Sequence, residues 1–124
     1  MVEAGSDTGG YVDGFVAPVP AANRDAYRDH ADKTAALFRD HGALRVVEAW
    51  SDDVPDGKVT DFRRAVQAKE DEAVVFSWVE WPDKAARMAG WGAIEGDARM
   101  TAPGDLPFDA KRMIYGGFAV LPLD

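Results

Sequence analysis

One predicted strand, residues 73–81, carries apolar side chains on both of its sides. It reads AVVFSWVEW, and runs rich in valine and aromatic residues are typical of β-strands. Alternate residues of a strand point to opposite faces of a sheet. The two apolar sets are Val75, Val79 and Trp81 on one side, and Val74, Phe76 and Trp78 on the other. Neither side of this strand is suited to face water.

The segment 43–51, ALRVVEAWS, repeats the pattern. Leu44, Val46 and Trp50 oppose Val47 and Ala49. A sheet with helices on one side only should alternate between apolar and polar residues. Apolar residues on both faces therefore require a second cover, and a chain of 124 residues has little left to supply one. We expect a homodimer that packs sheet against sheet.

The elements around these strands define the fold class. The pattern predicts, in order, a strand, a helix, two strands, a helix and a strand, over residues 11–19, 23–41, 43–51, 73–81, 82–94 and 112–120. This is the β-α-β-β-α-β order of a ferredoxin-like α+β fold, with one four-stranded antiparallel sheet and two helices on one face. Residues 11–124 are expected to form one domain, preceded by a flexible extension over 1–10.

Some local features have more than one interpretation. Within residues 59–72, Phe62–Val66 could form a strand, but a short helix beginning at Asp61 and capped by Thr60, or an irregular excursion, is favoured. Asn23 is the expected N-cap of the first helix. Gly14 indicates a bulge or a close backbone approach in the first strand, and Gly90 is expected to weaken the second helix by about 1 kcal/mol relative to alanine.

Composition narrows the function classes. There is no cysteine, and the net charge is −8, which disfavours nucleic-acid binding, to RNA included. No apolar run approaches the roughly 20 residues that cross a bilayer, and the first ten residues lack the features of a signal peptide. We expect a cytoplasmic protein that needs no membrane, metal or other cofactor.

Five segments resemble a known family: YVDGFVAPVP, HGALRVVEAW, DVPDGKVTDFRRAV, VVFSWVEWPDKAAR and LPFDAKRMIYGGF. They are similar to signature segments of the YbaA-like family, a bacterial and archaeal domain of unknown function, and cover nearly everything from Tyr11 to Phe118. The resemblance implies membership of the dimeric α+β barrel superfamily, which includes antibiotic-biosynthesis monooxygenase-like and muconolactone-isomerase-like proteins. It implies a fold and a homodimer, but no reaction. The N-terminal extension and the glycine-rich GWGAIEGD of the second helix depart from the family pattern.

Charged residues inside predicted strands are the candidates for chemistry. Glu48 shares a strand face with Trp50, and Glu80 shares one with Trp78. If the two faces coincide, the sheet presents carboxylates beside indole rings, whose apolar surroundings raise a carboxyl pKa and suit a general acid or base. The alternative is an ion pair between either glutamate and Arg45, Arg63 or Arg112, and this pair is favoured over a reactive carboxylate, with Glu80 expected near a strand end.

Three functions follow from these residues. The first is a cofactor-independent enzyme that acts on a small aromatic or oxygenated molecule in a cleft between sheet and helices. Its general base is Glu48 or Glu80, and its substrate-binding residues are Trp50, Arg63, Trp78, Arg112 and Tyr115. The second is a non-catalytic protein that binds a small ligand in the same cleft, and the third is a protein-interaction homodimer. Fold alone does not choose among them.

The two histidines do not predict a metal site. His30 and His41 are eleven residues apart, about 16 Å along a helix at roughly 1.5 Å per residue. They cannot share one ion. His41 is expected at the C-terminal end of its helix, beside Gly42, and His30 is expected as a half-buried residue of the helix face.

Overall fold

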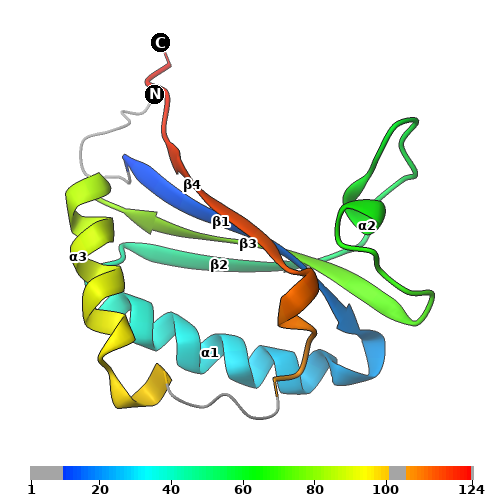
Figure 1. Cartoon of the computed structure of the whole chain (residues 1–124), viewed down its shortest axis with the longest axis horizontal. Coiled ribbons are helices and arrows are strands. Elements are labelled where there is room, and N and C mark those ends of the chain that lie inside the picture. The colour runs from blue at the N-terminus through cyan, green and yellow to red at the C-terminus, as the bar shows by residue number, and fades with distance from the viewer. Residues whose placement is uncertain (1–9, 101–105, 124) are drawn as a thin grey trace.

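The computed structural model describes residues 10–100 and 106–123, and a four-stranded antiparallel sheet dominates it. The strands are β1 (Tyr11–Pro20), β2 (Arg45–Trp50), β3 (Glu72–Trp81) and β4 (Ile114–Ala119), in the spatial order β2-β3-β1-β4. Two long helices, α1 (Arg24–Asp40) and α3 (Lys84–Glu95), follow β1 and β3. The α+β class and the β-α-β-β-α-β order are confirmed (Figure 1).

The helices lie on the side of the sheet that we call the helix face. Helix α1 runs beneath the strands, and α3 stands across one end of α1 (Figure 1). Helix α1 packs on the sheet through an apolar stripe, in which Tyr27, Ala31, Leu37 and Phe38 are buried. Short 3-10 helices occupy Ala21–Asn23, Ala98–Met100 and Ala110–Arg112. No helix among residues 10–100 and 106–123 is both long and apolar enough to cross a membrane.

The helix caps differ in part from expectation. Asn23 is the N-cap of α1, but its side chain makes no capping bond and instead donates to the Pro107 carbonyl at 3.1 Å. The short helix expected within 59–72 is confirmed as α2 (Phe62–Ala65), and its cap is Asp61 rather than Thr60. Asp83 caps α3 through the Ala86 N–H, so this helix begins two residues later than predicted.

Trp81 is the centre of the core on the helix face. Its side chain is fully buried, together with those of Leu37, Phe38 and Ile94. Gly90 of α3 lies directly on the indole: a Cβ at this position would stand 2.4 and 2.6 Å from two ring carbons. The glycine that lowers helix propensity is therefore what lets α3 reach the sheet.

Strand β1 contains two prolines without being interrupted. It continues to Pro20, one residue beyond the predicted end, and Pro18 is fully buried opposite Val74. The pairing of β1 with β4 ends at Val16. Beyond that point β1 has a neighbouring strand on one side only. Proline has no N–H to donate, and this is tolerated where no neighbouring strand would accept the hydrogen bond.

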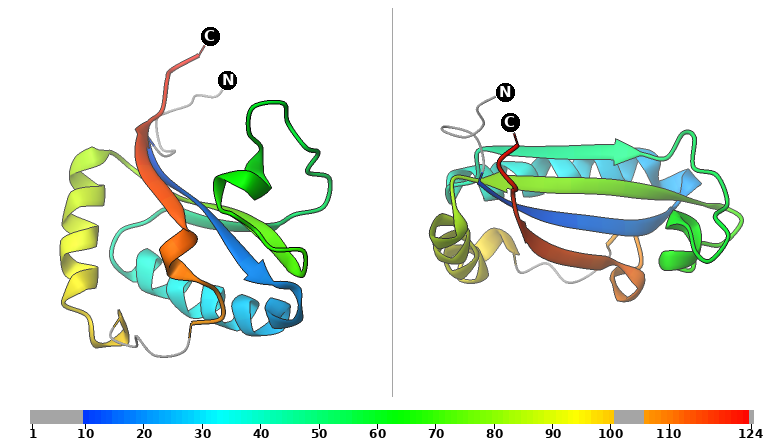
Figure 2. Two further views of the ribbon diagram at one scale, coloured as in Figure 1. Left: turned by 45° about the vertical axis from the view of Figure 1, so that its right-hand side comes forward. Right: turned by 90° about the horizontal axis from the view of Figure 1, so that it is seen from above.

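The opposite side of the sheet, the outer face, is apolar and largely open. It carries Val12, Val47, Phe76, Trp78, Ile114 and Phe118, as the cross-strand register shows. Helix α2 lies on this side (Figure 2) and covers one end through Val66, which packs on Val16 and Val74. The rest is exposed: Phe76 by 45 %, Ile114 by 46 % and Phe118 by 59 %. The apolar character predicted for both faces is thus confirmed.

One of these outer aromatic rings, that of Phe118, lies over a pair of glycines on β1 and β4. The Phe118 ring lies 3.6 Å from a Cβ built on Gly14 and 3.5 Å from one built on Gly116, and these two glycines are cross-strand partners. The bulge or close backbone approach expected at Gly14 is not found, because β1 pairs with β3 and β4 without interruption at this residue. Gly10, assigned to the extension by sequence, bonds to Pro82 and Val120 and so belongs to the sheet end; residues 1–9 lie outside the described part of the chain.

Candidate functional site

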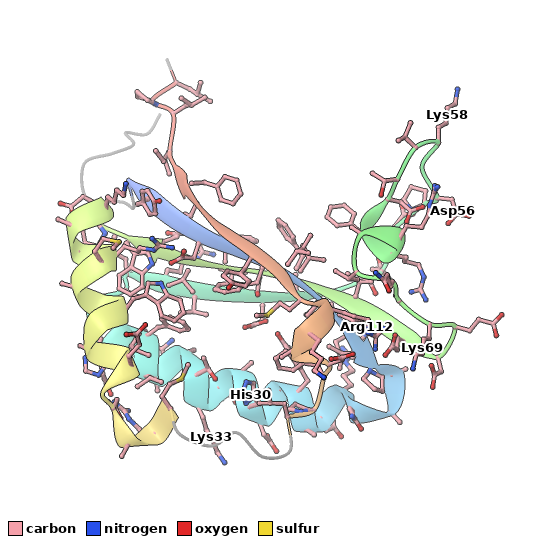
Figure 3. All side chains as sticks on the ribbon, in the orientation of Figure 1. His30, Lys33, Asp56, Lys58, Lys69 and Arg112 are labelled. Carbon is pink, nitrogen blue, oxygen red and sulfur yellow. The ribbon has the colours of Figure 1, made fainter. Side chains whose placement is uncertain are left out.

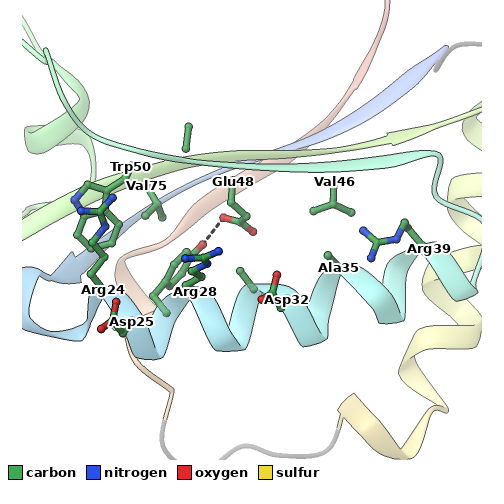
Figure 4. Close-up of a pocket in the computed structure, with 13 residues that line it drawn as sticks. Arg24, Asp25, Arg28, Asp32, Ala35, Arg39, Val46, Glu48, Trp50 and Val75 are labelled. Atoms are coloured by element: carbon green, nitrogen blue, oxygen red, sulfur yellow. Dashed lines mark hydrogen bonds between the residues drawn. The ribbon is translucent and has the colours of Figure 1, made fainter.

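A groove of about 560 Å³ runs between α1 and the edge strand β2. We call it the α1–β2 groove (Figure 4). Val46, Glu48 and Trp50 line it from β2, because these alternate residues point to the helix face, and Val75 of β3 adjoins them. Helix α1 supplies the other wall. The cleft expected between sheet and helices is present at this position.

Glu48 is the central polar residue of the groove. The Tyr27 hydroxyl donates a hydrogen bond of 2.6 Å to Glu48 Oε1, drawn as a dashed line in Figure 4. Tyr27 is buried between α1 and the sheet, whereas Glu48 remains accessible to solvent. The pair therefore joins a fixed hydroxyl to a carboxylate that a molecule in the groove can reach.

The surroundings change the proton affinity of both groups. Desolvation raises the pKa of Glu48 above its ordinary value, although hydrogen bonds from Tyr27 and Ser77 act in the other direction. Burial, followed by the negative charge of Glu48, raises the pKa of the Tyr27 phenol. Tyr27 thus stays protonated and donating, and Glu48 is a carboxylate with increased basicity, as a general base requires.

Arginines of α1 flank this pair. Arg24 lies over the Trp50 ring, with its guanidinium carbon 5.5 Å from the ring centroid. Arg28 points at the groove below Glu48, and Arg39 lies at the opposite end (Figure 4). Asp25 and Asp32 also line the groove from the helix. The groove thus has an aromatic and aliphatic wall on the side of the sheet and a row of charged side chains on the side of α1.

Glu80 is on the other side of the sheet from Glu48. Glu48 is the cross-strand partner of Ser77, while Glu80 is the partner of Arg45, so one carboxylate faces the helices and the other lies on the outer face. Glu80 Oε2 accepts a hydrogen bond from Trp78 Nε1 at 2.9 Å and lies 3.9 Å from Arg45 Nη1. The arginine partner favoured for Glu80 is confirmed, but the two glutamates do not share a site.

The remaining predicted substrate-binding residues lie outside the groove. Arg63 donates to the carbonyls of Lys69 and Glu72. Arg112 is paired with Glu72 at 2.7 Å and with Asp109 at 2.9 Å, at the end of the molecule where Figure 3 also places Lys69. Both guanidiniums are occupied in holding loops together.

Two aromatic residues of the predicted set are also elsewhere. Trp78 belongs to the outer face. Tyr115 stacks on Phe15 with ring centroids 6.4 Å apart, and it is 73 % exposed at the β4 edge. Of the seven predicted site residues, only Glu48 and Trp50 line the groove, while Trp78 and Glu80 are hydrogen-bonded to each other on the outer face.

The histidines take the structural positions expected of them. His30 is half-buried on α1, where it packs against Tyr27 and Phe108, and burial lowers its pKa. His41 is the C-cap of α1, and its Nε2 lies 2.9 Å from Asp97 Oδ2.

A second polar cluster, the Asp13 cluster, ties β1 and β3 to α3. Asp13 is 3 % exposed. Its carboxylate accepts hydrogen bonds from Trp81 Nε1 and Trp91 Nε1, each 2.9 Å long, and forms a two-point ion pair with Arg87. Trp81, Trp91 and Arg87 thus hold the Asp13 carboxylate in place, and the cluster is a structural anchor between the sheet and α3.

Sequence reasoning missed Tyr27 and Arg28 as site residues. In the sequence, Tyr27 falls on the apolar stripe of its helix and Arg28 on the charged side. The only available signal was that Tyr27 and Glu48 both point inward on neighbouring elements. Which inward residues meet depends on how α1 crosses β2, and the sequence pattern does not specify that crossing.

Comparison with known proteins agrees with the resemblance seen in the sequence. Residues 10–110 match the model of a family described as "Protein of unknown function (DUF1428)". The "Uncharacterized protein YbaA" of Escherichia coli K12 is 61 % identical over 109 residues, which are 87 % of this chain and 93 % of that protein. The protein of the same description from Shigella flexneri matches equally well. The chain therefore belongs to the DUF1428 family of YbaA-like proteins.

Proposed function

We propose that the protein binds a small aromatic or oxygenated molecule in the α1–β2 groove, where Glu48 transfers a proton to or from it. The observation that supports this is the Tyr27–Glu48 pair: a carboxylate with a raised pKa, held at one oxygen and open to the groove. A positioned carboxylate contributes about 10²–10⁴-fold to a proton-transfer reaction without a cofactor. Trp50 and Val75 supply an apolar wall for the bound molecule.

The free-energy cost of an unpaired carboxylate at Glu48 is an argument for function. Desolvating an ionised carboxylate is unfavourable unless the charge is paired, and Glu48 makes no ion pair within residues 10–100 and 106–123. A glutamine could keep a hydrogen bond with Tyr27 without that penalty. A carboxylate at this position therefore suits a role that requires proton exchange.

An exchange experiment tests the proposal without a known substrate. Small aryl ketones are incubated with the protein in D₂O, and deuterium uptake at the carbon next to the carbonyl is followed by NMR. We expect the wild type to accelerate uptake and Glu48→Gln to lose the acceleration while still binding the ketones. Uptake at the same rate with both proteins overturns the catalytic role, and retained binding then favours the non-catalytic alternative.

We also propose that two copies pack through their outer faces. The support is the set of exposed apolar residues on that face, including Phe76, Ile114 and Phe118. Soluble proteins that remain monomeric rarely expose contiguous apolar patches of this kind. A two-fold pairing of identical faces is self-complementary, and it gives the outer face the second cover that its composition requires.

Light scattering coupled to size-exclusion chromatography tests the assembly. The wild type is expected at about twice the chain mass of 13.4 kDa. Phe118→Asp places a charge on the outer face at strand β4 and is expected to give a folded monomer, because the side chain is 59 % exposed in one copy. Met88→Asp is the matched control: Met88 is 56 % exposed on α3, away from this face. A wild-type monomer at micromolar concentration contradicts the proposal.

A further inference from the structure

The nine arginines of the chain all lie in the described residues, and they differ sharply in their partners. Six of them bind carboxylates or carbonyls: Arg45, Arg63, Arg64, Arg87, Arg99 and Arg112. Arg24 lies on Trp50. Within residues 10–100 and 106–123, only Arg28 and Arg39 make no side-chain hydrogen bond, ion pair or ring contact, and both line the α1–β2 groove.

It is unexpected that Arg28 forms no ion pair with the aspartates of its own helix. Asp25 and Asp32 are three residues before it and four residues after it, at spacings that commonly form ion pairs, yet neither lies within 4.0 Å of its guanidinium. Nor do the charges of the arginines appear among the causes of the Glu48 pKa change. Arg28 points toward the groove in Figure 4, so its donors are available to a bound molecule.

We propose that the ligand of the groove is a small aromatic carboxylate, whose anionic group Arg28 binds beside the Tyr27–Glu48 pair. This rests on the proposed function above. A guanidinium matches the planar carboxylate with two parallel hydrogen bonds. Trp50 and Val75 contact the apolar part of the ligand. Glu48 then lies beside the ligand atoms that are next to the ligand's own carboxylate.

The charges of the groove favour a carboxylate over a dianionic phosphate. Only one free guanidinium lies near Glu48, and the groove also contains Asp25 and Asp32. Arg39 is eleven residues from Arg28, about 16 Å along α1 at roughly 1.5 Å per residue, so it cannot bind the same small anion. One guanidinium neutralises a single negative charge, so a monoanionic carboxylate fits this part of the groove better than a dianionic phosphate.

Two probes of similar shape and different charge provide the test. Benzoate and benzyl alcohol are titrated into the full-length protein, and binding is followed through the backbone NMR signals of Tyr27, Glu48 and Trp50. We expect benzoate to bind at least about tenfold more tightly, the effect of one charge-assisted hydrogen-bonded pair. Arg28→Gln is expected to abolish this preference by lowering benzoate affinity to that of benzyl alcohol.

Arg39→Gln is the matched control, since it removes the same charge from the same helix. Arg39 lies about 16 Å from Arg28 along α1, roughly twice the screening length of about 8 Å at physiological salt, so benzoate affinity should change less than about twofold. Equal binding of the two probes, or a preference that survives Arg28→Gln, overturns the carboxylate assignment while the groove remains a binding site. Absence of binding by both probes contradicts the proposed function as well.

Discussion

The carboxylate of Asp13 and the guanidinium of Arg87 form a two-point ion pair between β1 and α3, with Oδ1 2.7 Å from Nη2. The same carboxylate accepts hydrogen bonds from two tryptophans. Hydrogen bonding to Asp13 raises the pKa of Arg87 despite its partial burial. The pair positions α3 across the end of the sheet, and α3 in turn closes the core over Trp81.

Replacing Asp13 with asparagine should therefore be strongly destabilising. The change keeps the size of the side chain but leaves Arg87 without its anion, and removing one partner of a buried pair costs about 3–5 kcal/mol. The free energy of unfolding in urea, measured at one fixed protein concentration, checks this. Asp29→Asn is the control, because Asp29 is exposed on α1 and should shift stability by less than about 0.5 kcal/mol. Equal effects of the two variants would argue against an anchoring role.

Two glycines of α3 should respond in opposite ways to alanine. At Gly90 the added Cβ meets the Trp81 ring at 2.4 Å and the His41 carbonyl at 2.7 Å, so α3 must move away from the core. We expect a loss of stability of about 1–3 kcal/mol. At Gly92 a Cβ meets nothing within 4 Å, and alanine should stabilise by up to about 1 kcal/mol through helix propensity. Thermal unfolding of both variants gives the comparison; the same sign for both would refute the packing explanation.

Glu48→Gln should make the protein more stable at neutral pH. The pKa of Glu48 is raised in the folded state, so the folded protein holds this proton more tightly than the unfolded chain, and stability falls as pH rises from about 4.5 through the folded value. Glutamine remains neutral and avoids that loss. Urea unfolding at pH 7 and pH 4 should show a gain that shrinks toward the acid side. Glu70→Gln, at an exposed position, should show no such gain; a destabilised Glu48→Gln at pH 7 would contradict the desolvation argument.

Glu72→Gln should have the opposite pH dependence. Hydrogen bonds from Arg112, followed by one from the Lys69 N–H, lower the pKa of Glu72 to about 2. A depressed folded pKa adds stability above the unfolded value of about 4.5, and this stability is lost as pH falls from 4.5 toward 2. The variant should be less stable than the wild type by about 1.5–3 kcal/mol at pH 7 and nearly equal to it at pH 2. A constant difference over this range would exclude the ionised pair as its cause.

The site residues were predicted less well than the elements. Glu48 and Glu80 were considered together because each accompanies a tryptophan in its strand, but the register places them on opposite faces. Arg63 and Arg112 looked available because the sequence does not reveal which carbonyls and carboxylates they meet. Their partners lie between three and 45 residues away along the chain, and such irregular spacing leaves no periodic signal.

The sequence by itself determined the strands, the two long helices and the apolar character of both sheet faces. These depend on the alternation of side chains along a strand and on the stripe of a helix, which are local properties of the chain. Only the tertiary structure decided that Tyr27 meets Glu48, that Asp13 holds α3, and that Arg28 and Arg39 remain without partners in the described residues. Those relationships depend on strand register and helix crossing, which are fixed by packing between segments far apart in the sequence.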